Sequence, residues 1–169
     1  MPFTKISDTA FSGTKGITMV DLWRVSSTLT GDQSPITNLE RADDASSGTI
    51  GSAMSVSSGI FTFPQTGIYL VEFQFYVNLN GTANYAAFTI NVTQNNNTYD
   101  EVAKADESTD SSSRNSVGNC KAVVDVTDTS NDKVKFNFAT NNQSLSIVGS
   151  SSSNHTTMMF TKLKQQLQE

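Results

Sequence analysis

Hydrophobic and polar residues alternate most regularly in the segment that follows Gly67. One face of this segment is apolar without a break and consists of Tyr69, Val71, Phe73, Phe75 and Val77. Period-two alternation of aromatic and β-branched side chains is typical of a strand with one buried face. Pro64 has no N–H for a strand ladder, and Gly67 tolerates unusual dihedrals, so both suit a turn ahead of it. Residues 59–77 are therefore predicted to form an edge segment, a sharp turn and a long central strand.

The opposite face of this central strand changes from apolar to mixed polar character along its length. It holds Ile68, Leu70, Glu72, Gln74 and Tyr76. Large apolar side chains are costly when exposed and are stabilised when another surface covers them. That covering is either a second sheet of the same chain or another copy of the chain, and we favour the copy. Ile68, Leu70 and Tyr76 are therefore predicted to lie in an interface between subunits.

Shorter alternating segments recur along the chain and are separated by turn residues. Strands are predicted for residues 17–25, 85–92, 121–126, 133–138 and 156–163. Residues 36–44 fit either a loop or a short strand, and the very polar residues 100–119 are predicted to form an exposed loop with at most one poor strand. About ten short strands with this spacing predict an all-β sandwich or jelly roll.

The length and ends of the chain indicate one domain with two short extensions. A chain of 169 residues can bury a core without disulfides, and its single cysteine excludes an internal one. We assign 17–163 to the domain, 1–16 to an N-terminal arm and 164–169 to a polar C-terminal tail, and either extension is a candidate anchor. The N-terminus lacks the pattern of a secretory signal, and no apolar run is long enough to insert into a membrane.

Charge and chemistry narrow the function further. Charged residues make up 16% of the chain, the net charge is -5, and no basic stripe is visible, so nucleic acid is not an expected partner. His155 is the only histidine and lies in a polar segment, while Cys120 is expected to be a half-buried structural thiol. Without a nucleophile–base pair or a metal constellation, we predict no catalytic residue and no cofactor.

Two polar segments are weaker candidates for binding sites. Carboxylates crowd the predicted loop at Asp100, Glu101, Asp106, Glu107 and Asp110. Oxygen clusters can bind Ca²⁺, but this spacing is not that of an EF-hand, so solvated charge is the favoured interpretation. Amides adjoin an aromatic ring at Asn95, Asn96, Asn97 and Tyr99, as they do within 78–85. Such groups can bind a glycan, although an ordinary polar loop is favoured there too.

One motif connects the chain to a known family. Gly59, Phe61, Pro64, Gly67 and Tyr69 form a G-x-F-x-x-P-x-x-G-x-Y pattern that resembles C1q/TNF-like jelly-roll domains. The longer run from Met54 to Tyr69 resembles C1q-like chains encoded by marine tailed bacteriophages. The resemblance implies a ten-strand sandwich that forms a homotrimer. The chain departs from the family pattern in its last strand, which has no glycine, and in having no collagen-like Gly-X-Y stalk.

The resemblance also implies a function and a set of partners. It implies a non-enzymatic bacteriophage virion structural protein, carried on the virion surface after assembly in the host cytoplasm as a head-fibre, decoration or tail-fibre module. Its partners would be copies of itself and other virion proteins such as capsid, portal, tail or fibre. The alternative is a glycan-binding adhesin or receptor-binding tip domain that recognises a host surface glycan. An enzyme is ranked lowest.

Overall fold

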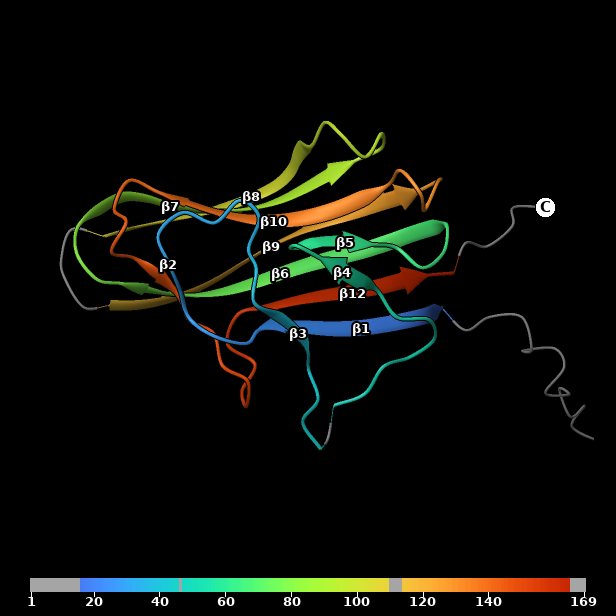
Figure 1. Ribbon diagram of the computed structural model, residues 1–169, viewed down its shortest axis with the longest axis horizontal. Coiled ribbons are helices and arrows are strands. Elements are labelled where there is room, and N and C mark those ends of the chain that lie inside the picture. The colour runs from blue at the N-terminus through green and yellow to red at the C-terminus, as the bar shows by residue number, and fades with distance from the viewer. Residues whose placement is uncertain (1–15, 46, 110–113, 165–169) are drawn as a thin grey trace, which may run out of the picture.

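Two antiparallel β-sheets pack face to face in the computed structural model, which describes residues 16–45, 47–109 and 114–164 (Figure 1). The strands are β1 (Ile17–Val25), β2 (Leu29–Thr30), β3 (Leu39–Arg41), β4 (Ser55–Ser57), β5 (Ile60–Thr62), β6 (Gly67–Leu79), β7 (Ala83–Thr93), β8 (Asp100–Thr109), β9 (Arg114–Val126), β10 (Lys133–Thr140), β11 (Ser146–Ile147) and β12 (Thr157–Leu163). Within these ranges the chain forms no helix that could cross a membrane. The predicted all-β jelly-roll sandwich is confirmed.

The first sheet is built around β6. Along one edge β6 pairs with β9, and along the other it pairs with β12 and β11. β1 and β3 continue the sheet beyond β12, and β2 continues it beyond β11. The second sheet has the order β4-β5-β10-β7-β8. The prediction of a long central strand is therefore correct, and β6 receives backbone hydrogen bonds along both edges.

The core lies between the sheets and is rich in aromatic side chains. Every inward side chain of β6 predicted from the alternation is fully buried: Tyr69, Val71, Phe73, Phe75 and Val77. The second sheet contributes Phe88, Phe136 and Phe138, and the rings of Phe75 and Phe88 stack with centroids 3.7 Å apart. Gly118 of β9 lies against the Phe75 ring, where any side chain would collide with it. The glycine thus makes room for the stacked pair.

The prediction of a loop over residues 100–119 is wrong. This region forms β8 and the first half of β9, and β9 pairs with β6 in continuous register from Arg114 to Val126. The sequence pattern is misleading because β8 is an edge strand with both faces largely polar, and charges on an edge discourage pairing with other chains. Strand formation here depends on pairing with neighbours, which a local pattern does not reveal.

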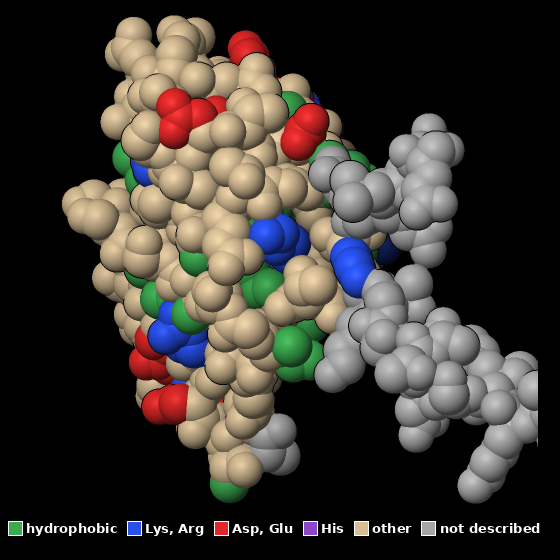
Figure 2. All heavy atoms as spheres, turned by 90° about the vertical axis from the view of Figure 1, so that its right-hand side faces the viewer, with side chains coloured by type: hydrophobic (Ala, Val, Ile, Leu, Met, Phe, Trp, Pro, Cys, Tyr) green, Lys and Arg blue, Asp and Glu red, His purple; other side chains and the backbone are tan. Residues whose placement is uncertain are grey.

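The first and last strands meet at one end of the sandwich. Ile17 at the start of β1 pairs with Leu163 at the end of β12, on the right in Figure 1. Seen from that end, hydrophobic and charged side chains are interspersed among polar ones (Figure 2). β1 begins at Ile17 and β12 ends at Leu163. Residues 1–15 and 165–169 lie outside the described residues, so the arm and the tail remain predictions.

Candidate assembly interface

The outer face of the first sheet carries the residues predicted to meet another subunit. Ile68, Leu70 and Tyr76 alternate with the buried residues of β6 and are themselves only partly buried in the single chain. Because side chains alternate between the two faces of a strand, these three point away from the core. The structure therefore places all three on an outer face that is available for contact with another copy.

Strand β9 extends this apolar surface in a way that the sequence pattern did not reveal. Val123 lies opposite Leu70 and is 69% exposed, and Val117 lies opposite Tyr76 and is 60% exposed. We call Ile68, Leu70, Tyr76, Val117 and Val123 the apolar row. Val117 falls in residues 100–119, which the sequence pattern predicts to be a loop, whereas Val123 lies in the predicted strand 121–126, to which the pattern alone assigns no partner. Continuing the alternation of 121–126 backward would have placed Val117 on the same face as Val123.

Polar groups occupy the middle of the apolar row. Lys121 Nζ lies 3.4 Å from Glu72 Oε1, and Gln74 lies opposite Asn119 in the next pair along the strands. A shallow hollow of about 310 Å³ opens here, with Leu22 and Met159 on its far side. The apolar ends provide contact area, and the charged pair between them provides groups that can fix the register of a partner.

His155 borders this face as a packing group. Its ring contacts the Tyr76 ring edge-on with centroids 5.4 Å apart, and its backbone oxygen accepts a hydrogen bond from Gln74 Nε2 at 3.3 Å. His155 Nδ1 is buried and has no hydrogen-bond partner among the described residues. The histidine thus supports Tyr76 from the loop that precedes β12.

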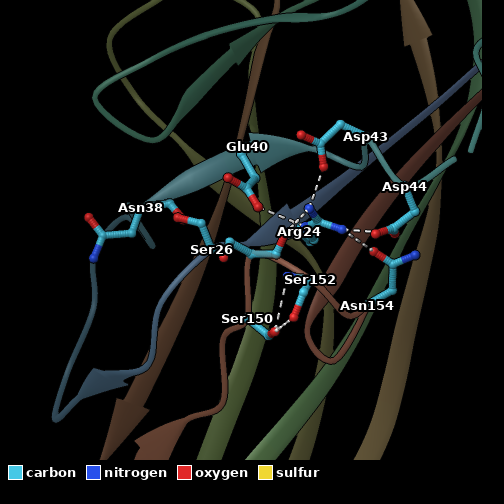
Figure 3. Close-up of polar contacts among 10 residues, drawn as sticks. Arg24, Ser26, Asn38, Glu40, Asp43, Asp44, Ser150, Ser152 and Asn154 are labelled. Atoms are coloured by element: carbon cyan, nitrogen blue, oxygen red, sulfur yellow. Dashed lines mark hydrogen bonds and ion pairs between the residues drawn. The ribbon is translucent and has the colours of Figure 1, made fainter.

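A buried arginine on β1, on the outer face of the same sheet, connects two loops. Arg24 of β1 is fully buried, with Nε 2.8 Å from Glu40 Oε1 and Nη1 2.9 Å from Asp44 Oδ2 (Figure 3). Nη2 lies 2.5 Å from Asp43 Oδ1 and also donates to the carbonyl oxygen of Ser151. Arg24 therefore joins the loop that follows β3 to the loop that precedes β12.

The electrostatics of this cluster hold Arg24 in its charged form. The hydrogen bond to Glu40 is the largest cause that raises the arginine pKa, burial opposes it, and the charges of Asp44, Glu40 and Asp43 raise it further. Removing one partner of a buried charge cluster leaves the others uncompensated. The cluster is consequently a structural clamp, and the sequence pattern did not identify it, since the partners lie 16 to 127 positions from Arg24 in the chain.

The weak calcium candidates lie along a strand, and the predicted loop that would have gathered them is absent. Asp100, Glu101, Asp106 and Glu107 all belong to β8, and Lys104 Nζ lies 3.1 Å from Asp106 Oδ2. Strand residues advance about 3.3 Å each, so Asp100 and Glu107 lie roughly 20 Å apart. Asp110 falls outside the described residues. Among the described residues, no three His, Cys, Asp or Glu side chains are placed so that they could hold a metal ion together.

The glycan candidates form a tight turn between β7 and β8. Asn95 Oδ1 accepts hydrogen bonds from Asn97 N at 2.9 Å and Thr98 N at 2.8 Å. Asn96 has a φ of 53°, and Lys135 Nζ lies over the Tyr99 ring at 4.4 Å from its centroid. The side-chain oxygen of Asn95 thus accepts hydrogen bonds within the turn, while Asn96 and Asn97 are exposed to solvent.

Cys120 lies on the inner side of β9. Its side chain is 7% exposed, and its thiol lies 3.9 Å from the Phe88 carbonyl oxygen. Burial, with a smaller contribution from the charge of Glu101, raises the pKa of the thiol to about 11. A thiol that remains protonated at neutral pH is a poor nucleophile. Cys120 therefore serves as a small packing residue.

Comparison with known proteins places the fold. No protein-family model and no curated protein matches this sequence. The Eiger TNF structure from S. frugiperda matches at 12% identity and a TM-score of 0.59, over 92% of this chain and 99% of that chain. The crystal structure of murine APRIL at pH 5.0 matches at 15% identity and a TM-score of 0.61, over 88% of this chain and 100% of that chain. The chain therefore has the TNF-like jelly-roll fold that its motif implied.

Proposed function

We propose that this chain is a non-enzymatic structural protein that forms a homotrimer through the outer face of its first sheet. The observation that carries the proposal is the apolar row, in which Val117 and Val123 are 60% and 69% exposed in the single chain. Apolar patches of this kind are covered in stable soluble proteins. A closed ring of identical subunits covers all copies of such a patch at once.

The geometry of the row suits a ring of copies. The apolar residues lie at both ends of the outer surface of β6 and β9, with Ile68, Leu70 and Val123 at one end and Tyr76 and Val117 at the other. In a ring of copies, each end can contact a different neighbour. Stable interfaces bury about 800 Å² per partner, an area that a face of several long strands provides. In such a ring, the Glu72–Lys121 pair of each subunit lies near the same pair of its neighbours. Attraction between opposite charges of different subunits then favours one alignment of the subunits.

The biological setting that we propose is the surface of a tailed-bacteriophage virion, as a head-fibre, decoration or tail-fibre module. Support comes from the run Met54–Tyr69, which resembles C1q-like chains of such phages. A second support is the pairing of Ile17 with Leu163, which brings the proposed anchoring arm and tail to one end of the sandwich. Attachment at that end leaves the opposite loops directed outward.

Purified particles test the setting. If the protein is a virion component, quantitative mass spectrometry of phage particles should find it at a constant ratio to the major capsid protein. The number of copies per particle that follows from this ratio should be a multiple of three. Removal of residues 1–16 should abolish particle binding while the free protein remains folded. Particles that carry no copies, or copies that vary between preparations, would contradict the virion role but leave the trimer proposal intact.

A further inference from the structure

The outer face of the second sheet holds a hollow that the assembly proposal does not use. Its volume is about 470 Å³, within the range of small-molecule sites. The floor is formed by alternate residues of β7 and β10, namely Ala87, Thr89, Asn91, Asn137 and Ala139. Two alanines lie directly opposite each other, Ala87 and Ala139, and their small side chains create the depression between taller neighbours.

The floor of the hollow is polar and contains an acceptor without a partner. Thr89 and Asn91 are each 8% exposed although they face outward, and Asn91 Nδ2 donates to Thr89 Oγ1 at 2.5 Å. Asn137 Oδ1 is buried and has no hydrogen-bond partner among the residues that the structure describes. Buried acceptors are almost always paired, and an unpaired one is costly. Rotation of the Asn137 amide toward a hydroxyl group in the hollow relieves this cost.

An aromatic side chain forms one wall. Tyr85 of β7 lines the hollow and is 43% exposed, which is unusual for a large ring on a strand. Its backbone is held by the end of β10, because Thr140 Oγ1 donates to the Tyr85 carbonyl at 3.1 Å and the neighbouring Asn84 N donates to Asn141 Oδ1 at 3.0 Å. An exposed ring on a fixed backbone provides a flat apolar surface with a polar hydroxyl at its edge.

The charges around the rim select the class of ligand. Asp32 and Glu101 line the hollow, and its cation, Lys104, is already paired with Asp106 at 3.1 Å. An anionic ligand would therefore meet two carboxylates and a lysine that is already neutralised. A purely apolar ligand would leave Asn137 Oδ1 unpaired. A neutral ligand with many hydroxyl groups and one apolar face satisfies both conditions.

The geometry points to a binding site for a neutral saccharide in this hollow, with Tyr85 stacking on the sugar ring and Asn137 accepting a hydrogen bond from a sugar hydroxyl. The site is separate from the Asn95–Tyr99 turn, because Tyr99 is not among the lining residues and instead lies against Lys135. It is also on the sheet opposite the apolar row, so it does not depend on the proposed trimer.

A glycan array probed with the full chain tests the inference, with neutral oligosaccharides compared against sialylated and sulfated ones. We expect binding to neutral glycans, and the best of them should then be titrated by calorimetry. The variants Tyr85→Ala and Asn137→Leu should each weaken binding at least about tenfold, as removal of a central contact does. Tyr85→Phe should retain most of the affinity because the ring remains.

Tyr99→Ala is the matched control, since it removes a tyrosine from the neighbouring turn and leaves the hollow intact. It should bind with the affinity of the unmodified chain. Thermal unfolding of every variant separates loss of binding from loss of fold, and Tyr85 is exposed enough that its removal should leave Tm nearly unchanged. Binding of no neutral glycan, binding of anionic glycans only, or loss of binding in Tyr99→Ala but not in Tyr85→Ala would each overturn the inference.

Discussion

The two outer faces of the sandwich are built by the same alternation but differ in what they expose. On the first sheet, the outward positions of β6 and β9 include the apolar row, with the polar pairs Glu72–Lys121 and Gln74–Asn119 at its centre and Asp125 opposite Ile68. On the second sheet, the outward positions of β7 and β10 that line the hollow are small or polar, apart from the ring of Tyr85. The first face is suited to a broad partner of its own kind, and the second to a small polar ligand.

This difference shows where function is encoded in a jelly roll. The inward residues of both sheets are large and apolar, and they would serve any sandwich equally well. The outward residues are not needed for the core, so their character reports on what covers them. The predictions below change one face at a time and ask whether the other is affected.

The largest expected effect is dissociation of the assembly by a charge in the apolar row. Val123→Lys adds a cation beside Lys121 on every copy, and a buried charge without a partner is strongly unfavourable. Because Val123 is 69% exposed in the single chain, the fold should survive. Sedimentation should therefore show a folded monomer. Lys135→Glu, on the other sheet, is the control and should leave the mass unchanged. A Val123→Lys protein that remains assembled would contradict the proposed interface.

The next effect concerns the clamp that borders the first face. Arg24→Met removes the cation from among Glu40, Asp43 and Asp44, so three carboxylates remain close together without compensation. We expect Tm to fall by several degrees in thermal unfolding. Lys104→Met breaks an exposed pair on the second sheet and should change Tm by no more than about 2 °C. Equal changes in the two variants would show that Arg24 is not a structural clamp.

A smaller effect is expected from filling the hollow on the second face. Ala139→Leu places a branched side chain on the floor between Ala87 and the rim. Glycan affinity should fall about three- to tenfold, which corresponds to about 1 kcal/mol. The mass of the assembly in solution and the Tm should not change, since Ala139 is exposed. If Ala139→Leu also dissociated the assembly, the two faces would not be independent.

The smallest effect concerns the turn that connects the two sheets between β9 and β10. Hydrogen bonds from Ser130, and then from Asn131, lower the pKa of Asp128 below its ordinary value. A lowered pKa in the folded protein stabilises it above the unfolded pKa, and this contribution is lost as the pH falls below about 4. The stability difference between the unmodified chain and Asp128→Asn should therefore be present at pH 7 and shrink toward pH 3. A difference independent of pH would contradict the role of the carboxylate.

Much of the fold could be predicted from sequence, and the reasons for success and failure are physical. The buried set of β6 was identified because each residue from Tyr69 to Val77 follows period two with an apolar side chain. β8 was missed because an edge strand has few apolar positions. The Arg24 clamp and the hollow depend on residues brought together by strand register, which no local pattern contains. Asn137 and Tyr85 share a surface only because β10 pairs with β7.

Sedimentation equilibrium of the unmodified chain at micromolar concentration tests the central claim most directly. The claim is that the apolar row on β6 and β9 is an interface among three copies. The account predicts a single species of about three times 18.2 kDa that does not dissociate on moderate dilution. A single species of 18.2 kDa across the whole concentration range would contradict the account, because Val117 and Val123 would then remain exposed.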